Sequence, residues 1–277
     1  MPKKFFEDYG AVIGDEAHLF KAVSLTKIMT KLTDCKYRIG LTGTLDDSKT
    51  HKLVLQGLFG MVNKVVSTAE LIDRKQLAQL KVICLNLKYN EVESKKVKDV
   101  KYFEELEYIT SSKPRNKYIR NLALALKGNT LLLFQLVEKH GEILFNLIKE
   151  KADQERKVFF VFGGTDTDDR EQIRAITERE DDAIIVASYG TFSTGINIRN
   201  LHNIVFSSPT KSPIRVLQSI GRGLRVGDKK DSATVYDISD DLSYKGKPNF
   251  TLNHFKERVN IYNREGFNYE IHMVDLK

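Results

Sequence analysis

Two adjacent carboxylates in the run Asp15-Glu16-Ala17-His18 are the side chains of this chain best suited to chemistry. The run follows the apolar residues 11–14, which we expect to form a short buried strand. Carboxylates at the end of such a strand suit phosphoryl transfer. One can hold Mg²⁺, directly or through water, and the next can orient the water that attacks a γ-phosphate. Asp15 is therefore a candidate metal ligand and Glu16 a candidate base, although acidic pairs after strands are also ordinary turn residues.

Three later segments carry polar or basic residues that could take part in the same chemistry. They are Gly40-Leu41-Thr42-Gly43-Thr44-Leu45, the run from Ser188 to Asn197, and Gln218-Ser219-Ile220-Gly221-Arg222-Gly223-Leu224-Arg225. Arg222 and Arg225 are three residues apart, so they share one face of a helix or turn. A guanidinium pair can bind phosphate oxygens bidentately. We expect Gly221, beside them, to let the backbone approach a neighbour closely.

Taken in order, the four segments resemble motifs II, III, V and VI of the superfamily 2 helicases of the DEAH type. These are nucleic-acid-stimulated ATPases with two RecA-like domains, and the resemblance covers nearly the whole chain. It implies ATP and Mg²⁺ as cofactors, and catalytic roles for Glu16, Arg222 and Arg225. It implies nucleotide contacts from Asp15, His18, Gln218, Gly195 and Asn197, and roles for Thr42 and Thr44 in coupling hydrolysis to strand movement.

Loops at strand ends supply candidate nucleic-acid contacts. Backbone N–H groups and hydroxyls at Thr194-Gly195 and at Gly163-Gly164-Thr165 can hold phosphates, and Gln135 ends another strand. Turn chemistry alone also explains the second loop. Contacts of this kind avoid base edges and give little sequence specificity. Within the family, the motifs resemble most those of phage recombination helicases, which implies branched or single-stranded DNA as partner and a place in recombination and repair.

The sequence departs from the family in one respect, because it contains no run of the form G-x-x-x-x-G-K-[ST]. Only 14 residues precede Asp15, too few for the missing strand, loop and helix. We therefore expect the C-terminal part of a helicase, inactive alone, whose partner is the upstream half of the same protein. The alternatives are a non-catalytic module that binds nucleic acid or a partner, an RNA helicase, and the translocase motor of a restriction system.

The composition is that of a soluble globular protein: 277 residues, 41% hydrophobic and 29% charged, with a net charge of +7 that favours a polyanionic partner. No apolar run approaches the roughly 20 residues of a membrane span. Cys35 and Cys84 stand apart in apolar settings, which argues for a reducing compartment and against a zinc site. We expect a cytoplasmic protein of a bacterial or phage-infected cell, with no membrane partner.

Short apolar runs alternate with amphipathic runs, a pattern typical of α/β proteins with parallel sheets flanked by helices. We expect RecA-like sheets in one partial and one complete motor domain. The expected strands are 11–14, 37–41, 81–87, 130–134, 158–162, 183–187, 203–207 and 234–238. The expected helices are 24–32, 49–58, 116–127, 142–151, 168–178, 214–222 and 252–264. The expected domains are 1–88, the C-terminal half of the first RecA-like domain; 89–112, a connector; 113–241, the second RecA-like domain; and 242–277, a C-terminal helix and tail.

Overall fold

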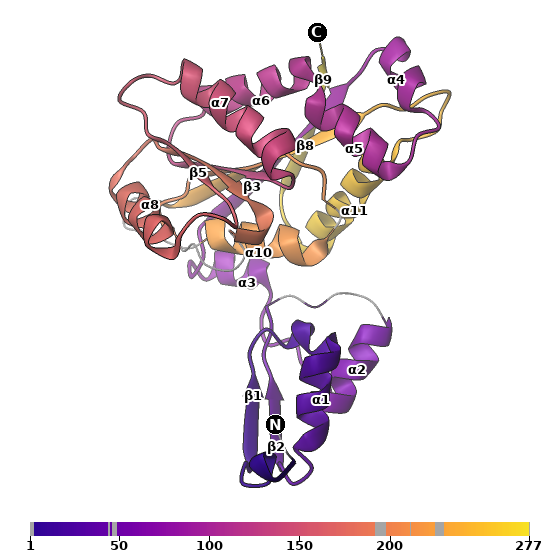
Figure 1. The fold of residues 1–277 in the computed structure, drawn as a ribbon, viewed down its shortest axis with the longest axis vertical. Coiled ribbons are helices and arrows are strands. Elements are labelled where there is room, and N and C mark those ends of the chain that lie inside the picture. The colour runs from indigo at the N-terminus through magenta and orange to yellow at the C-terminus, as the bar shows by residue number, and fades with distance from the viewer. Residues whose placement is uncertain are drawn as a thin grey trace. The chain divides into compact units, whose positions relative to one another are not determined.

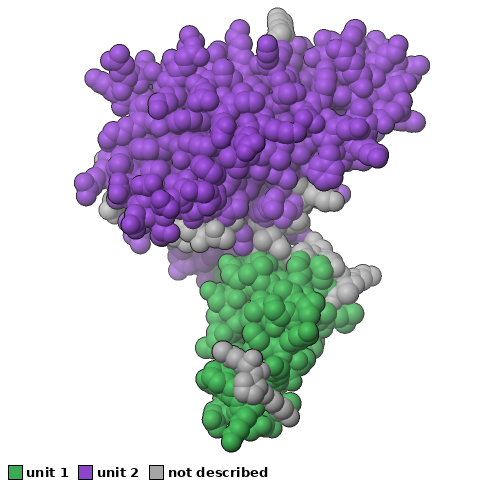
Figure 2. Space-filling model, in the orientation of Figure 1, with its two compact units in different colours: residues 1–66 green, residues 67–277 purple. Residues whose placement is uncertain are grey.

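The computed structural model of the chain describes residues 3–43, 45, 49–191, 198–210, 212–224 and 230–276. The chain divides into two compact units, residues 1–66 and 67–277, which Figure 2 distinguishes by colour. Each unit has its own parallel sheet and its own helices (Figure 1). No helix within the described ranges is long and apolar enough to cross a bilayer.

Unit 1 is built on two parallel strands, β1 (Ala11–Gly14) and β2 (Tyr37–Gly40), paired in register from Ala11 with Tyr37 to Gly14 with Gly40. Helices α1 (Val23–Lys31) and α2 (Lys49–Phe59) accompany them, with 3-10 turns at Lys3–Phe6 and Ala17–Lys21. The core of the unit consists of Phe6, Met29, Leu32, Cys35 and Leu58.

Two glycines allow aromatic rings to pack directly on the ends of these strands. A Cβ atom on Gly14 would lie 2.9 Å from Phe59 Cζ, and one on Gly40 would lie 2.9 Å from Phe59 Cγ. The Phe59 ring also meets Phe20 edge to face, with ring centroids 5.1 Å apart. A larger residue at either strand end would therefore displace these rings.

Unit 2 contains a seven-stranded sheet in the order β5-β6-β4-β7-β8-β3-β9, and every pairing in it is parallel. Its strands are β3 (Gln79–Lys88), β4 (Thr130–Phe134), β5 (Val158–Val161), β6 (Ile184–Ser188), β7 (Asn203–Phe206), β8 (Ser232–Asp241) and β9 (Tyr269–Asp275). The expected parallel α/β class is confirmed. In a parallel sheet all the strand-end loops fall on one edge, where α/β proteins bind ligands.

Helices cover both faces of this sheet (Figure 1). One face carries α4 (Glu91–Val97), α5 (Tyr102–Ser111), α6 (Lys113–Ala125) and α7 (Glu142–Lys151), and the other carries α3 (Thr68–Asp73), α8 (Thr167–Arg179), α10 (Pro213–Gly223) and α11 (Phe250–Glu265). Side chains alternate between the two cores, so Leu132 of β4 lies in the same core as Ile119 of α6, whereas Leu133 lies in the other core with Val216 of α10. Burial on both faces explains why β4 is apolar throughout.

The division into units differs from the domain boundaries expected from the sequence. Strand β3, expected in the first domain, lies between β8 and β9 in the sheet of unit 2, with Gln79 beside Ser232 and Val82 beside Tyr269. The expected connector 89–112 is largely helical, in α4 and α5, and buries Val97 and Ile109 in a core of unit 2. The boundary between the two compact units therefore falls between residues 66 and 67.

The segment after residue 241 is also part of unit 2. Helix α11 contributes Leu252, Phe255 and Ile261 to one core, and β9 adds an outer strand beside β3. The expected strands and helices otherwise lie within three residues of the observed bounds. Helices α3, α4 and α5 were not expected.

Candidate nucleotide and nucleic-acid sites

The loop after β1 holds the two candidate catalytic carboxylates in a defined backbone conformation. Asp15 and Glu16 are exposed, and the Glu16 N–H donates to Asp15 Oδ1 at 2.8 Å. Glu16 has φ 48° and ψ 49°, in the left-handed region, which costs a non-glycine residue about 1–2 kcal/mol. Strain of this kind clusters at functional sites, which supports the functional interpretation of Glu16.

His18 joins this loop to the segment that contains Thr42. The His18 side chain is buried, and its Nδ1 lies 2.9 Å from Thr42 Oγ1 and 3.2 Å from Glu16 Oε2. A carboxylate without a proton can only accept, so a hydrogen bond to Glu16 requires the hydrogen on Nδ1. The structure thus brings three predicted site residues into one polar group, although Thr42 is 24 positions from His18.

Backbone hydrogen bonds fix the same two segments to each other. The Ala17 N–H donates to the Leu41 carbonyl at 2.8 Å, and the Leu41 N–H donates to the Gly14 carbonyl at 2.8 Å. The ends of β1 and β2 are therefore tied together beyond the sheet.

The loop after β1 has the exposed carboxylates that an Mg²⁺ site with few protein ligands requires. Among the described residues, no three His, Cys, Asp or Glu side chains form a group that could hold a metal ion. Mg²⁺ keeps several of its waters and binds one or two carboxylates together with substrate phosphates. Asp15 presents one exposed carboxylate at the end of β1.

Several predicted site residues fall on parts of the chain that the structure does not describe. Thr44, Thr194, Gly195, Asn197 and Arg225 lie outside the described residues, as does most of the expected motif V. Arg222 lies on α10, where only its backbone is described. Gln218 is half-buried on the same helix, one turn earlier.

Helix α10, which carries the expected arginine motif, is set at both ends. Ser212 caps it, with Oγ accepting from the Arg215 N–H at 3.4 Å, and Pro213 takes the first helical position, where a missing N–H costs nothing. At the other end, a Cβ atom on Gly223 would collide with Ile204 Cδ1. Gly223 therefore allows α10 to approach β7 closely, whereas no atom lies within 4 Å of a Cβ placed on Gly221.

Three buried donors hold the segment that leads from β7 into α10. Arg115 donates to the Ser207 carbonyl at 2.8 Å, the Tyr189 hydroxyl to the Ser208 carbonyl at 3.1 Å, and Arg258 to the Thr210 carbonyl at 2.7 Å. These donors come from α6, the end of β6 and α11. Their convergence gives the start of α10 a defined place relative to the sheet.

The two arginines are themselves held by buried aspartates of β8. Arg115 donates to both oxygens of Asp240 at 2.7 and 3.0 Å, and Arg258 Nε lies 2.8 and 3.0 Å from those of Asp237. All four side chains are at most 1% exposed. Burial acts to lower the pKa of each guanidinium, but the adjacent carboxylate raises it above its usual value, so both pairs are ionic.

Gln135, a candidate nucleic-acid contact, lies exposed at the end of β4 and is positioned through Ser208. The Gln135 N–H donates to Ser208 Oγ at 3.1 Å, and His140 Nδ1 lies 2.9 Å from the same oxygen. Burial and the Arg115 guanidinium lower the pKa of His140 well below its usual value. His140 is therefore a neutral structural residue in the π-helical turn Val137–Gly141 that precedes α7.

The loop after β5 is a compact turn with its glycines exposed to solvent. Thr165 Oγ1 accepts from the Phe162 N–H at 3.0 Å, and the Thr165 N–H donates back to the Phe162 carbonyl at 3.0 Å. Gly163 and Gly164 are exposed. Arg170 of α8 donates to the Gly163 carbonyl at 3.1 Å and brings positive charge to the turn. Sequence reasoning missed Arg170, although its place in the first turns of a helix after a glycine loop was a usable signal.

The loops after β4 and β5 lie on the same edge of the sheet of unit 2, but the two strands are not neighbours. Gln135 and Gly163 follow β4 and β5, which are separated by β6, so the strand ends lie about 10 Å apart at about 4.8 Å per strand. The buried arginine pairs behind them were also missed, because nothing local in the sequence distinguishes a buried arginine from an exposed one.

Comparison with known proteins defines the class. Residues 114–227 match the family model of the helicase conserved C-terminal domain. Together with the parallel fold and the motif order, this match shows that the chain corresponds to the C-terminal portion of a superfamily 2 helicase.

The relatives include a well-matched phage protein. The chain is 38% identical over 288 residues to the ATP-dependent DNA helicase uvsW of Enterobacteria phage T4, covering 99% of this chain and 57% of that protein. The crystal structure of T4 UvsW matches with a TM-score of 0.63 at 36% identity, over 100% of this chain and 56% of that one.

There are also more distant matches, one in sequence and one in structure. Putative helicase 22 of a Sulfolobus islandicus filamentous virus is 24% identical, over 94% of this chain and 48% of that protein. The DNA-bound restriction-modification enzyme LlaBIII has a TM-score of 0.68 at 16% identity, over 99% of this chain and 22% of that one. The chain spans about half the length of the first curated relatives that it matches.

Proposed function

We propose that this chain is the C-terminal part of an ATP-dependent DNA helicase or translocase that remodels branched DNA in recombination and repair. The phage T4 relative, an ATP-dependent DNA helicase, supports the activity and the nucleic acid. The strand-end loops of unit 2 support contact with a nucleic-acid backbone, because they present exposed glycine N–H groups and Gln135 at one edge.

The observation that carries the proposal is the position of His18 between Glu16 and Thr42. A single buried imidazole nitrogen lies within 3.2 Å of both a candidate catalytic base and the threonine of the next motif. An ATPase that drives movement needs a physical connection between its nucleotide site and the elements that move, because hydrolysis must change the position of those elements. A simple turn at the end of a strand has no use for a buried histidine there.

Asp15 and Glu16 are the residues that would hold Mg²⁺ and orient the attacking water. Bound Mg²⁺ supplies charge neutralisation on the phosphates. Glu16 would accept a proton from, or orient, the nucleophilic water, and His18 would keep the Glu16 carboxylate in place. The phosphate-cradling loop must come from residues other than these 277, since the sequence lacks its signature.

The open face of unit 1 supports a partner from the same protein. Parallel sheets are normally covered on both faces, yet Ile13 is 66% exposed, Ile39 48% and Leu41 54%. We propose that these side chains of β1, β2 and the following loop pack against the rest of the first motor domain. The expected domain organisation, with the back half of one RecA-like domain followed by a complete second one, stays part of this proposal with the boundary moved to residues 66–67.

The test is hydrolysis by a protein in which an upstream segment with the phosphate loop is joined to this chain. Turnover should be stimulated by forked DNA, and Glu16→Gln should lower it about 10²- to 10⁴-fold, the usual contribution of a positioned base. Glu7→Gln, at an exposed glutamate of the same unit, is the matched control. Stimulation by a matched RNA fork, but not by DNA, would instead establish an RNA helicase.

Two further variants separate catalysis from coupling. Arg225→Ala should cost about 10³- to 10⁵-fold in turnover, as for other arginine fingers, while leaving DNA affinity nearly unchanged. Thr42→Val should retain hydrolysis but lower the base pairs unwound per ATP, with Thr33→Val as the control. The 277-residue chain alone should show no DNA-stimulated turnover, and turnover that Glu16→Gln abolishes in that chain would contradict the proposal.

A further inference from the structure

A small basic hairpin follows β8 on the edge of the sheet that carries the candidate nucleic-acid loops. Tyr244 and Lys247 exchange both backbone hydrogen bonds, at 3.1 and 3.0 Å. The two residues between them, Lys245 and Gly246, have φ values of 49° and 79°. Positive φ at both central positions is the signature of a type I′ turn, the tight turn that suits a two-residue hairpin.

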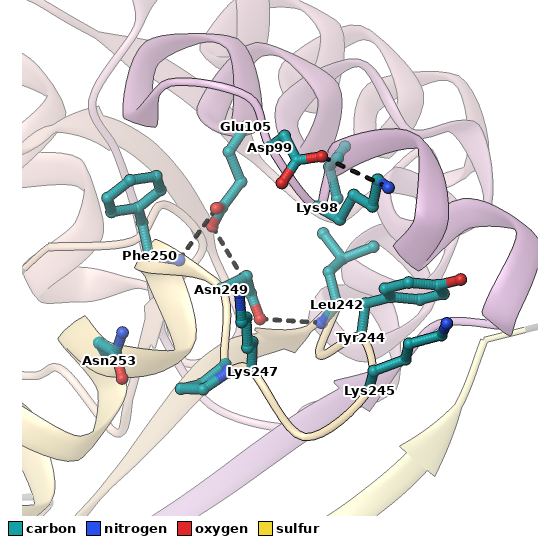
Figure 3. Close-up of a pocket in the computed structure, with 12 residues that line it drawn as sticks. Lys98, Asp99, Glu105, Leu242, Tyr244, Lys245, Lys247, Asn249, Phe250 and Asn253 are labelled. Atoms are coloured by element: carbon teal, nitrogen blue, oxygen red, sulfur yellow. Dashed lines mark hydrogen bonds and ion pairs between the residues drawn. The ribbon is translucent and has the colours of Figure 1, made fainter.

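The base of the hairpin is held firmly by a buried carboxylate. Asn249 Oδ1 accepts from the Leu242 N–H at 3.0 Å, and Asn249 Nδ2 donates to Glu105 Oε1 at 2.9 Å (Figure 3). Glu105, 1% exposed, also accepts from the N–H groups of Phe250 and Thr251 at 2.9 and 2.7 Å. The first turn of α11 is therefore already occupied by an anion of the protein, so the helix terminus itself is not a ligand site.

Lys98 and Lys245 lie beside Tyr244 at the rim of a pocket of about 390 Å³ (Figure 3). The ammonium groups of Lys98 and Lys245 lie 5.8 and 5.6 Å from the centroid of the Tyr244 ring. Lys247, opposite Tyr244 in the hairpin, lines the same pocket. Lys98 pairs with Asp99 at 3.4 Å, whereas Lys245 and Lys247 are exposed and have no carboxylate partner among the described residues.

The hairpin lies within reach of the other loops at this edge. Strand β8 neighbours β7 and is two strands from β4 and four from β5. At about 4.8 Å per strand, β8 runs about 10 Å to the side of β4, which precedes Gln135, and about 19 Å to the side of β5, which precedes Gly163. Asp237 is level with Leu133, so the end of β8 at Asp241 also lies four residues, about 13 Å, farther along the strand direction. One extended nucleic-acid strand can span such distances. The lysines have the point charge that phosphates attract.

We propose that Lys245 and Lys247 form a phosphate-binding site that holds the backbone of a nucleic-acid strand beside the loops after β4 and β5. The site rests on the proposed function only for the class of its ligand. The hydrogen bonds at its base fix the backbone of the hairpin, and the turn presents both lysines to solvent. No base edge is contacted, so the site takes strands of any sequence.

The test is binding of a labelled oligothymidylate to the 277-residue chain, followed by fluorescence anisotropy at several salt concentrations. The test variant is Lys245→Gly/Lys247→Gln, in which glycine suits the left-handed turn. The matched control is Lys75→Gly/Lys127→Gln. Lys75 is also left-handed, with φ 58°, and both control lysines precede strands, at the opposite edge of the sheet.

Removing one lysine–phosphate ion pair should reduce the slope of log K against log salt by about 0.7, which is about fivefold in affinity per lysine at 0.1 M salt. The hairpin variant should therefore bind about 25-fold more weakly, with a slope smaller by about 1.4. The control variant, in which the net charge falls by the same amount, should bind like the original chain. Equal binding by the original chain and the hairpin variant would overturn the proposal while leaving DNA binding and the proposed helicase function intact.

Protection of lysines from acetylation, read by mass spectrometry on the unaltered chain, gives a second test without any variant. The oligothymidylate should protect Lys245 and Lys247 but not Lys75. Protection by ATP or pyrophosphate and not by the oligonucleotide would show a nucleotide site and overturn the strand proposal. An original chain that neither binds the oligonucleotide nor is protected by it would also overturn it, whereas the proposed function itself is judged separately by hydrolysis in the longer protein.

Discussion

Removing one partner of the buried Arg258–Asp237 pair should be among the most destabilising single changes in unit 2. In Arg258→Met, the Asp237 carboxylate stays at 0% exposure with the Tyr262 hydroxyl, 2.7 Å away, as its remaining donor. The Thr210 carbonyl is also deprived of its 2.7 Å hydrogen bond from Arg258. An uncompensated buried charge of this kind costs about 3–5 kcal/mol.

Urea unfolding followed by circular dichroism measures this cost as a change in the free energy of unfolding of unit 2. For a unit of 150–250 residues, a destabilisation of that size lowers the melting temperature by about 6–20 °C. Arg74→Met is the control, since it removes the same group from a pair with Glu70 that is 4.0 Å apart, with side chains 62% and 54% exposed. An exposed pair of this kind contributes about 0.5 kcal/mol or less.

The double variant Arg258→Met/Asp237→Leu tests the reasoning most directly. It removes both charges, so the penalty for an unpaired buried charge disappears, and about 1–3 kcal/mol remains for each of two unpartnered groups, the Tyr262 hydroxyl and the Thr210 carbonyl. The Thr210 carbonyl is already unpartnered in Arg258→Met. The double variant should therefore be more stable than Arg258→Met alone. If the single variant unfolded like the Arg74→Met control, or if the two single effects simply added, the pair would not be the buried electrostatic unit described above.

Gly141→Ala should destabilise the chain by about 1–3 kcal/mol, because the new Cβ would lie 2.5 Å from the Phe134 ring. Gly221→Ala, in open space on a helix, should stabilise the chain by up to about 1 kcal/mol. The changes in the free energy of unfolding should therefore have opposite signs, and equal changes would refute the prediction. Burial lowers the pKa of Lys230 from its ordinary 10.5 to about 8. Since the unfolded chain then binds this proton more tightly, stability should rise with pH between about 8 and 10.5, relative to Lys230→Met. Parallel stability profiles for the two proteins over that range would contradict this prediction.

The sequence alone was sufficient for most of the strand and helix pattern, helices α3, α4 and α5 excepted, and for the family resemblance. Both depend on local order: apolar runs of strand length, amphipathic runs between them, and motifs that follow strands. The cap of α3 is equally local, because Ser67 and Glu70 form a capping box across three residues, although this helix was not expected. Asn90, which caps α4 through the Glu93 N–H, marks a helix inside the stretch that was expected to be a connector.

Tertiary structure decided where the units meet and which polar residues are buried. The sequence of β3 is compatible with either sheet, because the residues of a strand do not specify which strands it pairs with. The structure shows that it pairs with β8 and β9. The Arg115–Asp240 pair joins residues 125 positions apart. Because the pair is buried, Arg115 can hold the segment that leads into α10 through the Ser207 carbonyl. Burial itself depends on the packing of the whole unit. Residues 16, 18 and 42 were each predicted singly, but only the fold placed one histidine nitrogen between the carboxylate and the threonine.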